Sequence, residues 1–165
     1  DRFMFKVEIN YPDREEERTI VNRMSHPELD LSSVAVTSLD QIQNAKKWVD
    51  KIYMDEKIIE YILDVVVSTR PRMRSKLSSR QAEAKLDFLE NYIHFGASPR
   101  AGIMMTLAAK AAAFMEGRAY VVPQDVKNIA HDILRHRIIL SYEAEAEDVN
   151  SELLISKILD ELRTP

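Results

Sequence analysis

Glycine is scarce in this chain, and its scarcity limits the folds and sites that the chain can form. The 165 residues include three glycines, at positions 96, 102 and 117. A Walker A loop needs glycines at fixed spacing followed directly by Lys and Ser or Thr, and a dinucleotide-binding loop needs several glycines close together. Gly96 and Gly102 are separated by Ala97 to Ala101 and followed by Ile103, which fits neither motif. These residues therefore contain no glycine-rich phosphate loop.

Charge and cysteine content exclude further classes of function. Lys and Arg number 23 against 27 Asp and Glu, so the formal net charge is −4 at pH 7, which argues against a general binder of nucleic acid. The absence of cysteine excludes disulfide scaffolds, zinc–thiolate sites and thiol catalysis. The chain also shows no apolar leader and no run of about 18 apolar residues, so we expect no membrane span and a soluble, cytoplasmic protein.

The first eleven residues alternate between apolar and polar side chains. This period is typical of a half-buried strand, and Pro12 ends it. A lone strand cannot satisfy its own backbone donors and acceptors. We therefore expect residues 1–11 to be a strand cut from a larger sheet, with an exposed apolar face that favours self-association. The apolar positions are Phe3, Phe5, Val7, Ile9 and Tyr11.

The remaining residues have the pattern of a helical bundle. Capping signals at Asp13, Ser38 and Asp55 predict helices over 13–24, 38–52 and 55–69, with a loop over 25–37. The second and third of these helices are predicted to form a hairpin. Apolar stripes at helical spacing, with Ser-Pro or Pro starts at two of the helices, predict four more helices. They span 80–93, 98–116, 123–134 and 151–162.

Two segments have unusual charge patterns. Residues 70–80 carry five basic side chains and no acidic one, which predicts a solvated connector. The alternative for that run is a free-standing helical module that binds nucleic acid or an acidic protein. Residues 96–100 place Arg100 in the first turn of a helix, where its charge opposes the helix dipole unless an anion compensates it. Such an end could bind phosphate, or Arg100 could face water or pair with a glutamate.

Other catalytic and metal-binding patterns are missing from the sequence. None of the four histidines is paired at the i, i+4 spacing of a helical metal site, so no metal site is predicted. No serine lies in a G-x-S-x-G motif, and the acidic residues at 143–148 read as a solvated segment. A single arginine near the chain start, Arg2, indicates little by itself.

Several motifs together resemble the MoxR family of AAA+ ATPases, in order along most of the chain. They are Asp1-Arg2-Phe3-Met4-Phe5-Lys6-Val7, Tyr11-Pro12 with Glu16 and Glu17, Thr69-Arg70, Gly96-Ala97-Ser98-Pro99-Arg100-Ala101, Gly117 to Val126, Leu134-Arg135-His136-Arg137-Ile138 and Ser141 to Glu147.

The resemblance implies a mainly α fold, the helical-bundle lid subdomain of an AAA+ protein, preceded by one strand of the nucleotide-binding core. Residues 1–12 would be the last core strand and the hinge, and residues 13–165 the lid, with an insertion-like connector at about 70–93. Residues 72–80 are more basic than the family's usual connector. The Walker A, Walker B and sensor 1 elements would lie upstream, so these residues alone should not hydrolyse ATP.

The resemblance also assigns roles to individual residues. Arg100 would be the sensor 2 arginine, which reaches the γ-phosphate of ATP held by the same subunit. Arg2 would be the arginine finger that acts on ATP in the neighbouring subunit, and Tyr11 and Pro12 would pack near the adenine. The implied cofactors are ATP and Mg²⁺ in the intact parent, with neither bound tightly by this chain alone.

The implied partners are the parent's own AAA+ core, the neighbouring subunits of a homo-oligomeric, hexameric ring, and client proteins. ATP hydrolysis would drive chaperone-like remodelling or maturation of those clients, through a nucleotide-dependent rotation of the lid about a hinge at residues 10–14.

Overall fold

The protein is described by a computed structural model that covers residues 2–25 and 32–165, and it is mainly helical, as predicted. Residues 26–31, within the predicted loop, lie outside the described residues. The helices are α1 (Arg14–Met24), α2 (Leu39–Asp50), α3 (Glu56–Ser68), α4 (Leu89–Tyr92), α5 (Pro99–Met115), α6 (Pro123–Leu134), α7 (Tyr142–Ala146) and α8 (Ser151–Glu161), with short 3₁₀ turns η1 (Arg74–Lys76) and η2 (Ser79–Gln81). Two short strands, β1 (Ile93–Phe95) and β2 (Ile139–Leu140), pair antiparallel.

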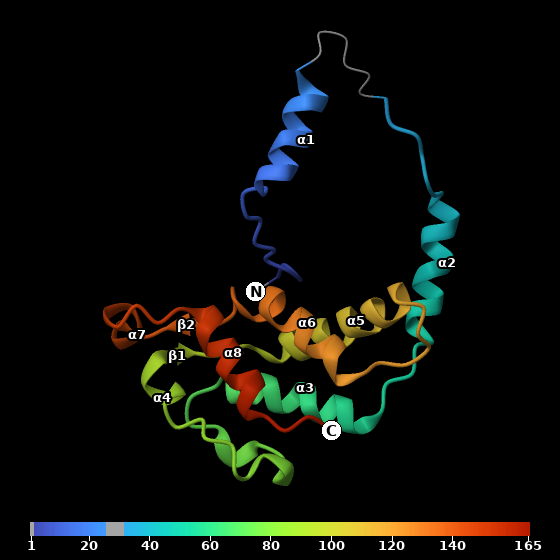
Figure 1. Ribbon diagram of the computed structural model, residues 1–165. Helices are drawn as coiled ribbons and strands as arrows, with labels where there is room; N and C mark the ends of the chain where they lie inside the picture. The colour runs from blue at the N-terminus through green and yellow to red at the C-terminus, as the bar shows by residue number, and fades with distance from the viewer. Residues whose placement is uncertain (1, 26–31) are drawn as a thin grey trace.

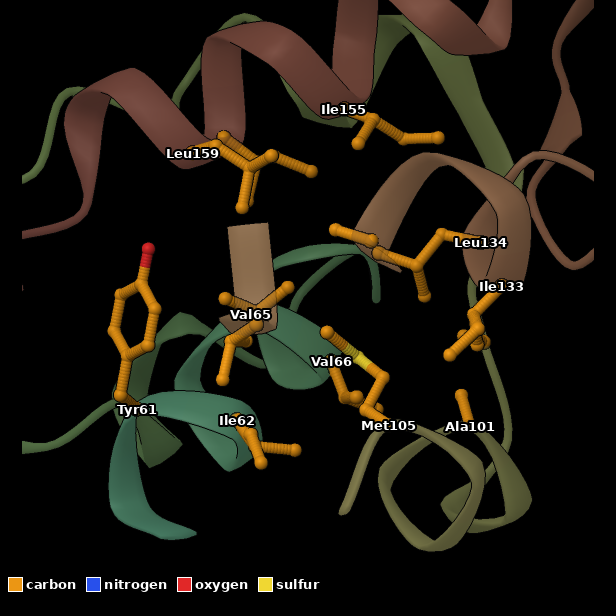
Figure 2. Packing of buried hydrophobic residues seen from close by; sticks show 14 of the residues in the cluster. Tyr61, Ile62, Val65, Val66, Ala101, Met105, Ile133, Leu134, Ile155 and Leu159 are labelled. Carbon is orange, nitrogen blue, oxygen red and sulfur yellow. The ribbon is translucent and has the colours of Figure 1, made fainter. Parts of the chain in front are cut away.

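Four helices, α3, α5, α6 and α8, pack together as the helical body (Figure 1). Their apolar side chains meet in one core, with Ile62, Met105 and Ile133 buried at its centre (Figure 2). The buried face of α5 is rich in alanine, including Ala101, so the neighbouring helix axes can approach closely. Burial of this apolar surface is the main stabilising contribution in the molecule, about 25 cal/mol per Å².

The predicted capping residues begin their helices. The Asp13 carboxylate accepts from the Glu16 N–H at 2.8 Å, and the Glu16 carboxylate accepts in return from the Asp13 N–H at 2.9 Å. Ser38 caps α2 in the same way, and Asp55 caps α3 by accepting from the Lys57 N–H at 2.9 Å. These side chains satisfy backbone donors that have no partner within the helix.

The first two helices stand apart from the helical body. We call helices α1 and α2 the arm; both extend away from the body in Figure 1, and neither contains a buried residue. The predicted hairpin of α2 with α3 is wrong. Instead, α2 contacts α5, where the Lys110 Nζ donates to the Asp50 carbonyl at 3.1 Å. The chain then pairs Tyr53 with Tyr120, and this bridge directs α3 away from α2 and into the body.

The strand predicted over residues 1–11 is absent from the described residues 2–12. No described strand lies beside this segment, so its alternating apolar side chains have no sheet to cover. Phe3 is 80% exposed and Ile9 is 90% exposed. The segment instead donates a hydrogen bond to α6 and accepts hydrogen bonds from the residues directly after α6.

The helix predicted over residues 80–93 is also wrong, except for the four residues of α4. Long-range hydrogen bonds replace the helical ones. The Gln81 side chain donates to the Arg163 carbonyl at 3.0 Å and accepts from the Arg163 N–H at 2.9 Å, and Leu86 is fully buried. The apolar spacing of this stretch therefore reflects packing of an irregular chain. Within the described residues, no helix is long and apolar enough to cross a membrane.

Candidate functional site

Arg100 lies in the first turn of α5, where the sequence predicted it. Ser98 occupies the N-cap position with extended backbone, and Pro99 takes the first helical position, where its missing N–H removes no helical hydrogen bond. No acidic residue lies in this first turn, and Arg100 is exposed. The helix end therefore presents a guanidinium beside the positive end of the helix dipole, a combination suited to an anion.

The chain leading to Arg100 is anchored on the C-terminal end of α3. The Ala97 N–H donates to the Thr69 Oγ1 at 2.9 Å, and the Arg70 Nε donates to the Ala97 carbonyl at 2.8 Å. Gly96 lies so close that a Cβ there would be 2.1 Å from the Thr69 carbonyl oxygen. Glycine is required at this contact, and both the donor and the acceptor of Ala97 are held, so the start of α5 has a rigid base.

A second group of side chains lies at the C-terminal end of α6. We call Asp132, Arg135, His136 and Arg137 the α6 clasp, and residues 3–6 the N-terminal segment. The Arg137 guanidinium donates to the carbonyls of Phe3 at 2.5 Å and Met4 at 3.2 Å, and also to that of Ile133.

The other members of the α6 clasp extend the same contact. The His136 Nε2 donates to the Phe3 carbonyl at 3.1 Å, since a carbonyl can only accept. The Arg135 Nη1 donates to the Lys6 carbonyl at 2.6 Å, and the Lys6 N–H donates to the Asp132 carbonyl at 2.8 Å. Arg135 also pairs with Glu152 of α8 at 2.5 Å, so the clasp is itself tied to the helical body.

The electrostatics connect the clasp to the start of α5. Arg137 is 5% exposed, and burial lowers the pKa of its guanidinium; the positive charge of Arg100 lowers it further. Burial also lowers the pKa of His136, against the opposing effect of its hydrogen bond to Phe3. Arg135 pairs with Asp132 and Glu152, so the positive charge of this region is partly compensated.

The other sequence-predicted residues lie at or beyond this region. Arg2 is exposed and directly precedes Phe3, whose carbonyl the clasp holds. Tyr11 is 94% exposed and Pro12 is exposed, both in the coil before α1, so these residues alone build no enclosed adenine pocket.

The basic run at residues 70–80 does not form one cationic face. Arg70 turns inward to the Ala97 carbonyl, and the Arg80 Nη1 reaches the Thr164 carbonyl at 3.5 Å. Arg70 and Arg72 line an open cavity of about 700 Å³ together with Glu90 and Glu143, so its charge is mixed. This arrangement gives the nucleic-acid alternative no support. No group of three or more possible metal ligands occurs in the described part of the chain.

The sequence predicts the position of Arg100, places Thr69-Arg70 in a motif without a role, and assigns Arg137 no more than a part in the packing of the lid. The partners of Thr69 and Arg137 are residues far away in the chain. The one local signal is Gly96, because a glycine two residues before the N-cap of a helix suggests a close backbone approach.

Comparisons with known proteins give a consistent picture. Residues 89–158 match the AAA lid domain family. Chaperone MoxR1 of Mycobacterium tuberculosis is 31% identical over 165 residues, which cover 100% of this chain and 41% of that protein. Protein YeaC of Bacillus subtilis, described as uncharacterized, is 29% identical over 167 residues, covering 100% of this chain and 46% of the relative.

A solved structure shares this fold. The crystal structure of a putative ATPase from Cytophaga hutchinsonii has a TM-score of 0.87 and 35% sequence identity, and the match covers 99% of this chain and 47% of the other. The chain thus spans less than half the length of these relatives.

Proposed function

The chain belongs to the MoxR family of AAA+ proteins, as its C-terminal, lid-containing region, and from this premise we propose that it closes on ATP bound by an AAA+ core. In this proposal Arg100 is the sensor 2 residue and contacts the γ-phosphate of ATP in the same subunit. ATP and Mg²⁺ are bound by the core, which lies in the part of the protein outside this chain. The lid then contributes a charged contact to hydrolysis rather than the whole reaction.

One observation carries the proposal: an exposed arginine in the first turn of a helix whose base is rigidly anchored. A guanidinium that is held before the reaction stabilises phosphoryl charge without reorganising during the reaction. The contacts of Gly96 and Ala97 with Thr69 and Arg70 supply that rigidity. Pro99 adds to it because its ring restricts the backbone at the first helical position.

We further propose that Arg2 acts in trans, as an arginine finger toward ATP in the neighbouring subunit of a homo-oligomeric ring. The exposure of Arg2 supports this role, because a residue that reaches into another subunit must be accessible. Tyr11 and Pro12 would pack near the adenine, with one side supplied by the core. Residues 1–12 would then join the lid to the core and contain the hinge, and residues 13–165 would be the lid.

The mechanical part of the proposal is a rotation of the lid about residues 10–14. Closure of Arg100 on the γ-phosphate links ATP occupancy to the angle between lid and core. That rotation would drive chaperone-like remodelling of client proteins. The relative in Mycobacterium tuberculosis is named a chaperone, which supports this activity for the present protein.

The first test is ATP turnover by the protein together with its ATP-binding core. Arg100→Ala should lower kcat by about 10²–10³-fold, the usual effect of removing one preorganised donor. Arg163→Ala is the matched control, since it removes an arginine whose side chain is 63% exposed and whose pair with Glu83 lies at the surface. Unchanged turnover in Arg100→Ala would contradict the sensor role.

The role of Arg2 in trans needs mixed rings. Subunits with Arg2→Ala are combined with subunits that cannot bind ATP but keep Arg2. Turnover should reappear, because an intact ATP site then faces an intact finger. Turnover no higher than in either population alone, in rings shown to assemble, would contradict action in trans.

A further inference from the structure

The hydrogen bonds between the N-terminal segment and the α6 clasp use the backbone of the segment, and the Met4 side chain packs, partly buried, against the core. The carbonyls of Phe3, Met4 and Lys6 accept from clasp side chains, and the Lys6 N–H donates to the Asp132 carbonyl. Meanwhile the Phe3 side chain is 80% exposed. The α6 clasp therefore fixes the backbone of residues 3–6.

Arg137 is the centre of this contact. Its guanidinium is buried and donates to two carbonyls of the segment and to one of α6. If the segment withdrew, a buried cation would lose two of these acceptors, and a buried charge that loses its hydrogen bonds is far more costly than an exposed one. The buried position of Arg137 thus opposes release of the segment.

The Phe3 carbonyl has two donors, Arg137 and His136. This doubly held carbonyl belongs to the residue directly after Arg2. Because consecutive Cα atoms are about 3.8 Å apart, a clasp that holds Phe3 also restricts where the backbone of Arg2 can lie. The positive charge of Arg100 is the second cause, after burial, of the lowered pKa of Arg137.

We propose that Arg137 is a positioning residue that holds Arg2 in a set relation to Arg100, so that one lid aligns the arginines of two adjacent ATP sites. The inference rests on the proposed function, in which Arg100 serves the subunit's own ATP and Arg2 the neighbour's.

The contact itself is tested by hydrogen exchange in the protein with its core. Arg137→Gln should speed exchange of the Lys6 amide at least tenfold, because that amide is protected only while the segment stays docked. Exchange in α3 and α5 should stay within twofold, as should every amide in the control Arg163→Gln. An unchanged Lys6 rate would overturn the inference, whatever the ATPase assays show.

The positioning role is tested by combining substitutions. Arg137→Gln should lower kcat at least tenfold with KM for ATP within twofold. In Arg2→Ala protein, adding Arg137→Gln should lower kcat less than twofold further, because a residue that acts through Arg2 has nothing left to position. Losses that multiply, or an unchanged kcat in the single variant, would overturn the role.

Two further variants protect this test against simple unfolding. Arg137→Lys keeps the charge but cannot fork between two carbonyls, so its kcat should fall between wild type and Arg137→Gln. Lys6→Pro removes the N–H that donates to Asp132 and leaves the core of the helical body unchanged, and it should reproduce the kcat loss. If Lys6→Pro keeps full turnover although the segment has undocked, the inference is wrong. If Arg2→Ala itself keeps full turnover, the proposed function of Arg2 fails, while the exchange result still decides the contact.

Discussion

The arm and the helical body are built from helices with the same kind of caps, yet they bury very different amounts of apolar surface. Asp13 and Ser38 cap the arm helices as Asp55 caps α3. The arm helices bury no residue, whereas α3 alone buries seven, so the two regions differ in packing and not in local signals. Short helices gain most of their stability from packing of an apolar face. The body is therefore stabilised by a core of its own, while the arm depends on its caps.

The largest contrast should come from truncating one apolar side chain in each region. Met105 is fully buried in α5, and Met105→Ala should lower the free energy of unfolding by about 2–5 kcal/mol through the cavity it leaves. Ile42 of the arm is 43% exposed, and Ile42→Ala should change it by less than about 0.5 kcal/mol. Urea denaturation followed by circular dichroism measures both. Equal losses would show that the arm shares the core.

Gly96 and Gly102 differ in the space around them. Gly96→Ala should destabilise the protein by about 1–3 kcal/mol, because the added Cβ would overlap the Thr69 carbonyl. Gly102 lies within α5 with nothing within 4 Å of an added Cβ, so Gly102→Ala should stabilise it by about 0.5–1 kcal/mol. Thermal unfolding compares the two. If both variants lowered the thermal stability, the open space around Gly102 would not explain its effect.

Removal of one capping side chain in each region should destabilise its helix by about 0.5–2 kcal/mol. The two losses should appear in different measurements. Asp55→Ala should lower the global free energy of unfolding, since α3 belongs to the core. Ser38→Ala should instead unwind α2 locally and leave the global transition unchanged. The sequence has a single tryptophan, Trp48 of α2, and it is 59% exposed, so its fluorescence reports on the arm. If Ser38→Ala shifted both the Trp48 fluorescence transition and the global unfolding transition, the arm and the helical body would unfold as one unit.

The smallest expected effect is a pH dependence confined to the body. Burial lowers the pKa of His136 from its ordinary value of 6.5, so the folded state favours the neutral ring. The unfolded chain therefore binds the proton first, and stability should fall as pH drops below about 6.5, through the folded pKa. His136→Asn should flatten that part of the stability profile, measured by urea denaturation between pH 5 and 8, values that bracket the ordinary pKa of about 6.5. An unchanged profile would mean that the ring is not held in its neutral form.

The sequence predicted the helix starts whose signals lie within a few neighbouring residues. The caps at Asp13, Ser38 and Asp55 and the Pro99 and Pro123 helix starts depend on neighbours in the chain, and the structure confirms them. The strand predicted over residues 1–11 is wrong, because a strand needs a second strand beside it. An alternating pattern cannot show whether that second strand is present. The irregular chain near Gln81 likewise depends on Arg163, 82 residues away.

The candidate site divides in the same way. The place of Arg100 followed from Ser98-Pro99 beside it, and the structure agrees. Its anchoring did not, because Thr69 and Ala97 are 28 residues apart, and Arg137 and Phe3 are 134 apart. Contacts at such separations are set by the packing of the helical body, which periodicity alone does not determine.

Contact between Arg100 and the γ-phosphate is best tested by nucleotide affinity in the protein with its core. The measurement is the Kd of a non-hydrolysable ATP analogue and of ADP, in wild type and in Arg100→Ala. A charged hydrogen bond contributes about 1.5–3 kcal/mol, so the analogue should bind about 10- to 150-fold more weakly to Arg100→Ala, with ADP affinity unchanged. Equal weakening of both nucleotides, or of neither, would contradict the claim.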